Sequence, residues 1–397
     1  MSQTRFALVA GGGTGGHLVP ALAVARALAA GRPPGSVELV GSRRGLDRDL
    51  LAEAGVPVTL LPGRGIVRRA DPASLLANAA ALCALSWAVV LALGVVARRR
   101  PGVVVAMGGY ASVPVALAAA VLAVPVVLVN VDARPGAANR LVGRFAKAAA
   151  VAFPGTPLPR AVVTGAPVRA EIVAAARPSQ EDRLAARRQL GVPEERRVVA
   201  AVGGSLGARR INAAVLELAQ LWSGRADVAL YHVVGSRDYG WSRAEAPEGQ
   251  PTLWYQQVEY ERHMAFFYQA ADVVVCRAGA NTVAELAVVG VASVLVPLPG
   301  APGDHQGANA AALAGAGAAV VIDDAECDGA RLAAELDALW SRPGALGSMA
   351  KAAASLGRPE ALAAVTAVVE AHARRRRGPD PAGRQVHSGA PVRDGAP

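Results

Sequence analysis

The sequence predicts an α/β fold with two doubly wound, parallel-sheet domains that face each other across a cleft. Three observations support this prediction. Short Val-rich apolar runs alternate with helical stretches, as in buried parallel strands joined by crossover helices. A strand followed by a glycine turn occurs twice, at "LVAGGGTGGHL" and at "VAAVGGSLGARRIN". The chain has 397 residues, which is long enough for two such domains.

The expected strands are short and nearly continuous in apolar character, as strands buried on both faces should be. In the first half they are Phe6–Ala10, Val37–Gly41, Val56–Leu61, Val103–Met107, Pro125–Asn130, Ala148–Phe153 and Ala161–Thr164. In the second half they are the run before the second glycine turn, Val228–Gly235, Asp272–Cys276, Val291–Val296 and Ala318–Ile322. Ligands of such sheets bind outside the carboxyl ends of the strands, so each glycine turn is expected to line the cleft.

The domain boundary is expected at "TGAPVR", whose glycine and proline interrupt the pattern. We therefore place the first domain at 1–166 and the second at 167–344. A helical segment at 345–371 closes the fold and is expected to pack back on the first domain. Residues 372–397 are rich in Arg, Pro and Gly, so a disordered basic tail is expected.

The chain is basic, with a net charge of +10, and only 4% of its residues are aromatic. Such a charge suits nucleotide phosphates or anionic lipid. A nucleic-acid role is disfavoured, because the basic residues cluster in the tail and around one apolar segment, with little aromatic interleaving. Cys83, Cys276 and Cys327 form no CxxC pair, which fits a reducing compartment. The N-terminus enters a strand without a signal-peptide pattern.

The apolar segment Pro72–Ala97 contains no charged residue. Its length would allow a membrane span. The arginines on both sides, Arg68 and Arg69 before it and Arg98–Arg100 after it, favour a helix that lies on an anionic membrane surface. A span would also interrupt the strand series. An ordinary buried helix is the third interpretation.

The first glycine loop has the residues of a phosphate cradle. Gly11, Gly13 and Gly16 satisfy G-x-G-x-x-G, but Glu38 lies inside its strand, so a dinucleotide site is weakly supported. His17 occupies the position of the P-loop lysine, which disfavours an NTPase. Glycines let backbone N–H groups approach a ligand at the positive end of the next helix. That end also lowers an imidazole pKa, so His17 could act as a neutral base, although local capping is equally compatible.

Six stretches resemble, in order, the motifs of the MurG family, the N-acetylglucosaminyltransferases of bacterial peptidoglycan synthesis. They are "GGGTGGHLVPALAVARAL", "MGGYASVPVALAA", "AFPGTPLPRAVVTGAPVRAEI", "VGGSLGARRIN", "ADVVVCRAGANTVAELAVVGVASVLVPLP" and "DHQGANAAALAGAGAA". The resemblance extends to about Ala371. It implies the GT-B fold of two Rossmann-like domains. It also implies a hexosyltransferase that moves GlcNAc from UDP-GlcNAc to the 4-hydroxyl of MurNAc in lipid I, with inversion, giving lipid II.

The resemblance assigns residues to both sides of the cleft. The acceptor side includes His17 near the reacting groups, together with Gly13, Gly108, Gly109, Tyr110 and Asn139. Residues expected to contact the donor UDP-GlcNAc are Thr14, Gly15, Gly16, Asp132, Arg169, Ser205, Thr282, Glu285, Gln306 and Asn309. Among these, Arg169 would pair with the diphosphate, and Glu285 would accept hydrogen bonds from both ribose hydroxyls.

The other donor-side residues have matching chemistry. Ser205 would bind the UDP phosphates beside backbone amides. Thr282 should begin a helix, and the amides of Gln306 and Asn309 can donate to and accept from GlcNAc hydroxyls.

One motif departs from the family pattern. Where the family has His-Glu-x-Asn, "LVNVDARPGAANR" has Val129, Asn130 and Asp132. We hypothesise that Asp132 replaces the missing carboxylate, acting on the acceptor hydroxyl or orienting His17. Leu206 also stands where many members have Gln. Two alternatives stay open. One is a GT-B transferase or epimerase with another UDP-sugar or acceptor, and the other is a non-catalytic nucleotide-sugar binder.

Neither a metal nor a cofactor is expected. The single Asp-x-Asp, at Asp47–Asp49, lies among arginines and fits a solvated helix face. The expected partners are lipid I in the membrane, an anionic phospholipid surface and other cell-wall synthesis proteins. The expected location is the cytoplasmic face of the cell membrane, as a peripheral protein.

Overall fold

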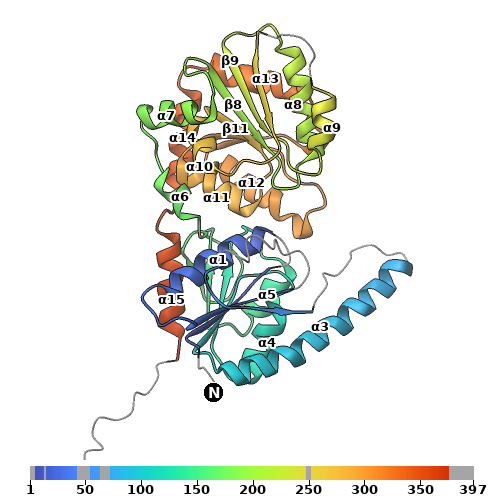
Figure 1. Ribbon diagram of the computed structural model, residues 1–397, viewed down its shortest axis with the longest axis vertical. Coiled ribbons are helices and arrows are strands. Elements are labelled where there is room, and N and C mark those ends of the chain that lie inside the picture. The colour runs from blue at the N-terminus through green and yellow to red at the C-terminus, as the bar shows by residue number, and fades with distance from the viewer. Residues whose placement is uncertain (1–4, 13–14, 43–53, 63–71, 247–251, 375–397) are drawn as a thin grey trace, which may run out of the picture.

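The computed structural model describes residues 5–12, 15–42, 54–62, 72–246 and 252–374, without the side chains of 72–80, 82 and 302. It contains two separate parallel sheets, one in each half of the chain (Figure 1). The expected Gly13, Thr14 and Asp47–Asp49, and the tail beyond Arg374, lie outside the described residues.

The first sheet has seven parallel strands in the order β3-β2-β1-β4-β5-β6-β7. Their bounds are β1 Ala7–Ala10, β2 Val37–Ser42, β3 Val58–Leu61, β4 Val103–Ala106, β5 Val126–Asn130, β6 Ala148–Val151 and β7 Ala161–Val163. The helices of this half are α1 Gly15–Ala29, α3 Pro72–Arg99, α4 Val113–Val121 and α5 Ala137–Gly143. One apolar core joins α1 to the sheet, and a second core joins α3 and α4 to it.

The second sheet has six strands in the order β10-β9-β8-β11-β12-β13. Their bounds are β8 Arg197–Val202, β9 Val228–Val233, β10 Trp254–Val258, β11 Val273–Cys276, β12 Ala292–Leu295 and β13 Ala319–Val321. The α-helices are α6 Ala170–Ala174, α7 Gln180–Leu190, α8 Arg209–Leu221, α9 Tyr239–Ala244, α10 Met264–Ala270, α11 Ala280–Val289, α12 His305–Gly315, α13 Gly329–Ser341 and α14 Ala345–Leu356. Two short 3-10 turns are η1 Pro302–Asp304 and η2 Asp324–Glu326.

The expected strands are all present, with ends shifted by one or two residues. One further strand, β10, was not predicted. Its sequence WYQQV contains two adjacent glutamines, and all five residues are only half-buried. It is an edge strand of the second sheet and pairs with β9 alone. A polar edge strand lacks the continuous apolar run that identifies a central one.

The prediction of one helix over 345–371 that packs on the first domain was wrong in its first half. The chain breaks at Gly357–Pro359 into α14 and a final helix α15, Ala361–His372. Helix α14 packs on α11 and β12 of the second domain, whereas α15 packs beside α1 and over β4–β6 of the first (Figure 1). Glycine and proline interrupt the helix, which lets the chain return to the first domain.

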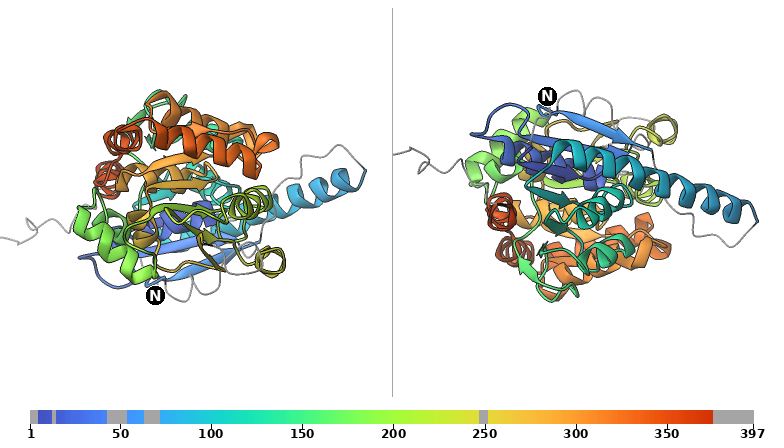
Figure 2. Two further views of the ribbon diagram at one scale, coloured as in Figure 1. Left: turned by 90° about the horizontal axis from the view of Figure 1, so that it is seen from above. Right: turned by 90° about the horizontal axis from the view of Figure 1, so that it is seen from below.

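Glu38 of β2 is a buried carboxylate, 1% exposed, at the end of the sheet away from the glycine turn. Its oxygens are bound by Arg5 Nε at 3.1 Å, Arg99 Nε at 2.9 Å and Thr59 Oγ1 at 2.6 Å. Pairing is what makes a buried charge tolerable. Since Arg99 ends α3, this cluster fixes the C-terminal end of that helix, while its N-terminal part projects from the domain (Figure 2).

Candidate active site

The side of the first domain that faces the second domain, here called the first wall, carries His17 in the opening turn of α1. Its imidazole lies against Gly108 and Gly109, which follow β4 with φ of +91° and +72°. A Cβ on Gly108 would come within 3.1 Å of His17 Cε1, and one on Gly109 within 3.0 Å of Cδ2. Glycine is therefore required at both positions by backbone conformation and by the close approach of the ring. Tyr110, next in the chain, contacts the Ser42 hydroxyl at 3.4 Å.

His17 is held in its neutral form. Burial lowers its pKa and the nearby His305 adds to that shift, while the Asp132 carboxylate and the backbone of Met107 oppose it. Atom Nδ1 is buried and has no hydrogen-bond partner among the described residues. A neutral imidazole near a carboxylate can take a proton and share the resulting charge, which is what a general base requires.

The altered motif after β5 forms a hydrogen-bonded turn. Asn130 is 1% exposed and accepts from Asn139 Nδ2 at 2.8 Å. Its own amide donates to the Asp132 carbonyl at 2.6 Å. Asn130 therefore braces the turn that carries Asp132. Asn139 Oδ1 is buried and has no partner within the described chain.

The two domains meet at Asn309 of α12, whose side chain is fully buried. Its Nδ2 donates to Asp132 Oδ1 at 3.0 Å and to the Ala278 carbonyl at 3.1 Å, and its Oδ1 accepts from the Ala133 N–H at 2.8 Å. Its amide is thus used by protein groups in this arrangement. The neighbouring Gln306 accepts from the Leu298 N–H at 2.9 Å.

The second wall contains Glu285 of α11, which is 7% exposed. Arg169 donates to its Oε1 from Nε at 3.1 Å and from Nη2 at 3.0 Å. Tyr268 of α10 donates to its Oε2 at 2.9 Å. Burial raises the pKa of Glu285, and Arg169 opposes this shift. The structure thus joins two expected site residues, Arg169 and Glu285, into one ion pair.

Helix α11 begins at Ala280, so the prediction that Thr282 lies at a helix start is confirmed. The positive end of α11 faces the first domain, where Asn281 Nδ2 donates to the Gly16 carbonyl at 3.3 Å. Gly15 and Gly16 open α1, so the first turns of two helices from different domains meet here. Such ends favour an anionic ligand.

The second glycine turn, with Ser205, lies between β8 and α8. The backbone of Gly207 has φ of +90°, and a Cβ there would lie 3.1 Å from Asp238 Oδ2. Arg237 Nη2 donates to the Gly207 carbonyl at 3.2 Å, and the N–H of Ser236 donates to the Ser205 carbonyl at 3.1 Å. These contacts hold the loop in shape.

A buried polar network supports that turn from behind. His232 of β9 is fully buried, with Nε2 3.0 Å from Asn212 Oδ1 and Nδ1 3.0 Å from the Tyr255 hydroxyl. Asn212 Nδ2 donates to the Val234 carbonyl at 3.0 Å and to Asp238 Oδ2 at 3.1 Å. With that amide orientation, His232 Nε2 carries the proton. Burial lowers the pKa of His232 to about 3.

Comparison with known proteins decides the family. The glycosyltransferase family 28 N-terminal domain matches residues 7–151, and its C-terminal domain matches residues 198–365. A UDP-N-acetylglucosamine–N-acetylmuramyl-(pentapeptide) pyrophosphoryl-undecaprenol N-acetylglucosamine transferase from Moorella thermoacetica is 41% identical over 91% of this chain and 97% of that protein. One of the same name from Desulforudis audaxviator is 37% identical over 91% and 97%.

The chain belongs to the MurG family. The crystal structure of Acinetobacter baumannii MurG is similar, with a TM-score of 0.72 and 27% identity over 93% of this chain and 99% of that one. The predicted GT-B fold is confirmed. A putative UDP-N-acetylglucosamine 2-epimerase from Listeria monocytogenes, 16% identical with a TM-score of 0.61 over 93% and 97% of the chains, shares the fold alone.

Three residues of this MurG family member were missed by the sequence reasoning. Tyr268 lies within "MAFFYQA", a pattern that indicates only an aromatic residue of the core. His305 precedes Gln306 in a recognised motif and could have been found there. Asn212 lies in a helix after the glycine turn, and only the fold places it beside His232. Buried polar side chains at element ends are the available signal.

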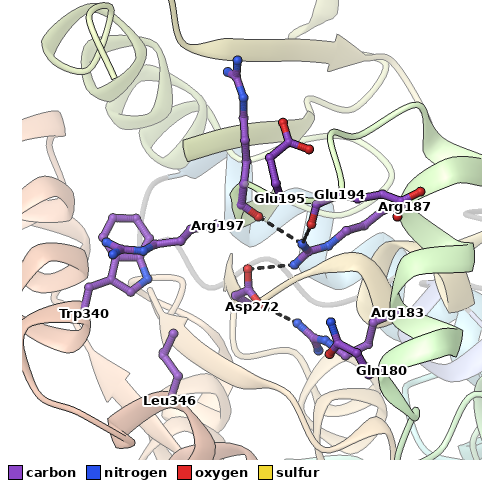
Figure 3. Close-up of a pocket in the computed structure, with 10 residues that line it drawn as sticks. Gln180, Arg183, Arg187, Glu194, Glu195, Arg197, Asp272, Trp340 and Leu346 are labelled. Carbon is purple, nitrogen blue, oxygen red and sulfur yellow. Dashed lines mark hydrogen bonds and ion pairs between the residues drawn. The ribbon is translucent and has the colours of Figure 1, made fainter. Parts of the chain in front are cut away.

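A cavity of about 390 Å³ lies elsewhere in the second domain (Figure 3). Asp272, which precedes β11, binds Arg187 Nη2 at 2.9 Å and also Arg183, with Trp340 on the opposite side. The cavity is at the amino ends of β8 and β11, whereas the glycine turn follows the carboxyl end of β8. We assign it a structural role, because Arg187 also binds the carbonyls of Ala270 and Arg196.

Proposed function

We propose that this chain transfers GlcNAc from UDP-GlcNAc to the 4-hydroxyl of MurNAc in lipid I, with inversion, to give lipid II. The observation that carries the proposal is the arrangement of side chains on the facing walls of the two domains. A neutral imidazole, His17, lies on one wall, and a clamped carboxylate, Glu285, lies on the other. Membership of the MurG family and the names of the relatives support the same reaction.

In the proposed mechanism, His17 removes the proton of the acceptor hydroxyl. The hydroxyl oxygen forms a bond to the anomeric carbon of GlcNAc as the bond from that carbon to the UDP oxygen breaks. Attack comes from the face opposite UDP, so the configuration inverts. Asp132 stabilises the imidazolium, because its negative charge already interacts with the His17 imidazole. The groups that act on the attacking hydroxyl and on the departing UDP are then in place before the reaction begins.

The donor is held by the second wall. The first turns of α8 and α11, with Ser205 and Thr282, bind the departing diphosphate. Glu285 accepts from the ribose. Arg169 acts mainly by holding Glu285, and Gln306 reads the sugar. Asn309 contacts the sugar only when its bond to Asp132 opens. Gly109, Tyr110 and Asn139 complete the loops around the acceptor, and Gly15 and Gly16 at the start of α1 contact the donor.

The test is UDP release from UDP-GlcNAc, measured with and without a soluble lipid I analogue, followed by mass analysis of the product. The expected result is acceptor-dependent release and a GlcNAc-MurNAc product. Release without a disaccharide would point to another acceptor or to an epimerase-type reaction. Binding of UDP-GlcNAc without release would assign a nucleotide-sugar-binding role, the alternative that Asn130 and Asp132 in the altered motif keep open.

We further propose that the protein works at the cytoplasmic face of the membrane, with α3 on an anionic lipid surface. Trp87, Val90 and Leu91 are 57%, 54% and 36% exposed on this projecting helix (Figure 2). Exposed apolar side chains of this kind mark a contact surface. In the described part of the chain, no helix has the length and apolar character needed to cross a membrane.

Vesicle co-sedimentation tests the surface. Trp87→Glu is expected to weaken binding to phosphatidylglycerol vesicles by roughly tenfold. The variant loses an aromatic ring that would enter the lipid and gains a negative charge that the anionic lipid repels. The matched control is Leu221→Glu, which changes an exposed apolar residue of α8 in the second domain. An equal loss of vesicle binding in both variants, or no loss in either, would show that α3 does not contact the membrane. Association with other cell-wall synthesis proteins stays a prediction.

A further inference from the structure

The segment that departs from the family motif joins the two domains. Three consecutive residues after β5, Asp132, Ala133 and Arg134, each make a hydrogen bond to the second domain, and we call them the clasp. Asp132 and Ala133 bind the side chain of Asn309, whereas Arg134 Nη1 donates to the Gly303 carbonyl at 3.4 Å. Helix α12, which carries Asn309, lies on the side of the second domain that faces the first (Figure 1).

The clasp engages the Asn309 amide at both its nitrogen and its oxygen. One N–H of Nδ2 donates to Asp132 Oδ1 at 3.0 Å, and the other donates to the Ala278 carbonyl at 3.1 Å. Oδ1 accepts from the Ala133 N–H at 2.8 Å. An amide nitrogen has two N–H groups, so both are in use. A ligand that accepts a hydrogen bond from Asn309 must first displace a protein group.

The bond to Asp132 is the one that resists displacement. It joins an amide to a carboxylate, and such charge-assisted bonds are about twice as strong as neutral ones. The Asn309 side chain is fully buried, so the carboxylate competes for it away from water. Asp132 itself is only half-buried, so truncation of its side chain removes little packing.

This contact acts on one part of the donor only. In the proposed function, Asn309 contacts the sugar of UDP-GlcNAc, whereas Ser205, Thr282 and Glu285 bind the UDP part. A ligand therefore has to release Asn309 only if it carries the sugar. Its apparent affinity is reduced by the fraction of molecules in which Asn309 is free to bind it. Bare UDP has no such requirement.

We propose that Asp132 is a specificity-determining residue that competes with the donor sugar for Asn309, so that it weakens binding of UDP-GlcNAc relative to bare UDP. The inference deepens the proposed function and rests on it through the sugar contact of Asn309. It gives the aspartate of the altered motif a second role beside His17, which is to restrain loading of the donor. Its sign is opposite to that of a ligand contact, because loss of the carboxylate strengthens binding.

The experiment is calorimetric binding of UDP-GlcNAc and of UDP to the full-length protein and to Asp132→Ala, without acceptor. In the variant, UDP-GlcNAc should bind about tenfold more tightly, as for release of one hydrogen bond to a charged group, and UDP should stay within about threefold. The readout is the ratio of the two dissociation constants, because a general change in charge acts on both ligands. Turnover is not the readout, since Asp132 also belongs to the proposed mechanism.

Two single variants serve as controls. Asp132→Asn keeps an oxygen that can accept from Asn309 but makes the bond neutral, so the ratio should shift by only about threefold. Glu171→Ala removes a different carboxylate near the donor. Glu171 is 56% exposed and lies 3.5 Å from Arg169 Nη1. Loss of its charge should leave the ratio within about twofold of the unaltered value.

A double-mutant cycle tests whether the effect passes through Asn309. In the Asn309→Ala background, Asp132→Ala should change the ratio by less than about twofold, because the amide that the carboxylate holds is gone. If Asn309→Ala does not fold, the graded order of Asp132→Ala, Asp132→Asn and the unaltered protein decides the same question.

The outcomes separate this inference from the proposed function. Equal tightening of UDP and UDP-GlcNAc in Asp132→Ala, or an unchanged ratio, would overturn the competition. Selective weakening of UDP-GlcNAc would show that Asp132 contacts the donor sugar directly and would also overturn it. The predicted ratio without acceptor-dependent UDP release would support the competition and overturn the transferase proposal. Absence of binding of either ligand to the unaltered protein would overturn both.

Discussion

The two walls differ in how their buried titratable side chains are paired. On the second wall, Glu285 has hydrogen bonds on both oxygens, and His232 has partners on both ring nitrogens. On the first wall, His17 Nδ1 and Asn139 Oδ1 are buried without a partner among the residues described, and the second wall has one such atom where it meets the first domain, Asn281 Oδ1. Unpaired buried groups are costly, whereas paired ones rigidify a site.

This contrast suggests a division of labour between the walls. A carboxylate that protein donors already hold, as Glu285 is held, does not have to be ordered by its ligand, which suits a nucleotide donor, whereas Asn309 must release Asp132 before it contacts the sugar. A wall with unpaired groups gains most when a ligand pairs them, which suits an acceptor that must be present for transfer. The first wall also carries the departure from the family motif, at Asn130 and Asp132. The predictions below test this difference.

The largest effect is expected from His17→Ala. Loss of a general base should lower kcat by about 10²–10⁴-fold. The dissociation constant for UDP should stay within about twofold of the unaltered value, because the donor wall is untouched. Steady-state UDP release and calorimetry measure the two quantities. A kcat within threefold of the unaltered enzyme would exclude His17 as the base.

Asp132→Asn is expected to lower kcat by roughly 10–100-fold, because the imidazolium loses its nearby negative charge while the bond to Asn309 can persist. The double variant Asn130→Glu with Asp132→Asn restores the family pattern at both positions. It should recover most of the lost rate if a carboxylate is needed on this wall. Unchanged turnover in Asp132→Asn would show that Asp132 has no catalytic role.

On the second wall, His232→Gln should change how stability depends on pH. The folded-state pKa is about 3, below the ordinary value of 6.5. Between these values the unfolded chain takes up a proton that the folded protein does not, so stability falls as pH falls. The contribution to the slope is at most about 1.4 kcal/mol per pH unit.

The variant should flatten the fall in urea-unfolding free energy between pH 6 and pH 4 relative to the unaltered protein. At pH 7 and above, where His232 is neutral in both states, the two pH profiles should run parallel. An unaltered slope in the variant would mean that His232 titrates normally in the folded protein.

The smallest effect is expected from Ser205→Ala in the second glycine turn. One neutral hydroxyl contributes about 0.5–1.5 kcal/mol, so KM for UDP-GlcNAc should rise roughly threefold to tenfold with little change in kcat. Backbone amides of the turn remain to bind phosphate. A fall in kcat with unchanged KM would show that Ser205 acts on the leaving group in the transition state.

Much of the fold was predictable because parallel strands that are buried on both faces appear in the sequence as nearly continuous apolar runs. β1 to β9 and β11 to β13 were predicted, while β10, with its two glutamines, was not. The single helix expected over 345–371 is two helices on different domains. A helix-breaking pair such as Gly357 and Pro359 indicates that the helix is interrupted. The domain on which each of the two helices packs depends on which apolar surface the rest of the fold leaves uncovered.

The sequence by itself determined the two-sheet architecture and the family, and it predicted most of the candidate site residues, since these depend on local patterns and ordered motifs. Only the tertiary structure decided how those residues are paired. It joined Arg169 to Glu285, added Tyr268, and used Asn309 to hold the turn of Asp132. Two of these contacts join residues more than a hundred positions apart, and all three depend on distance and direction in space, which a linear pattern does not record.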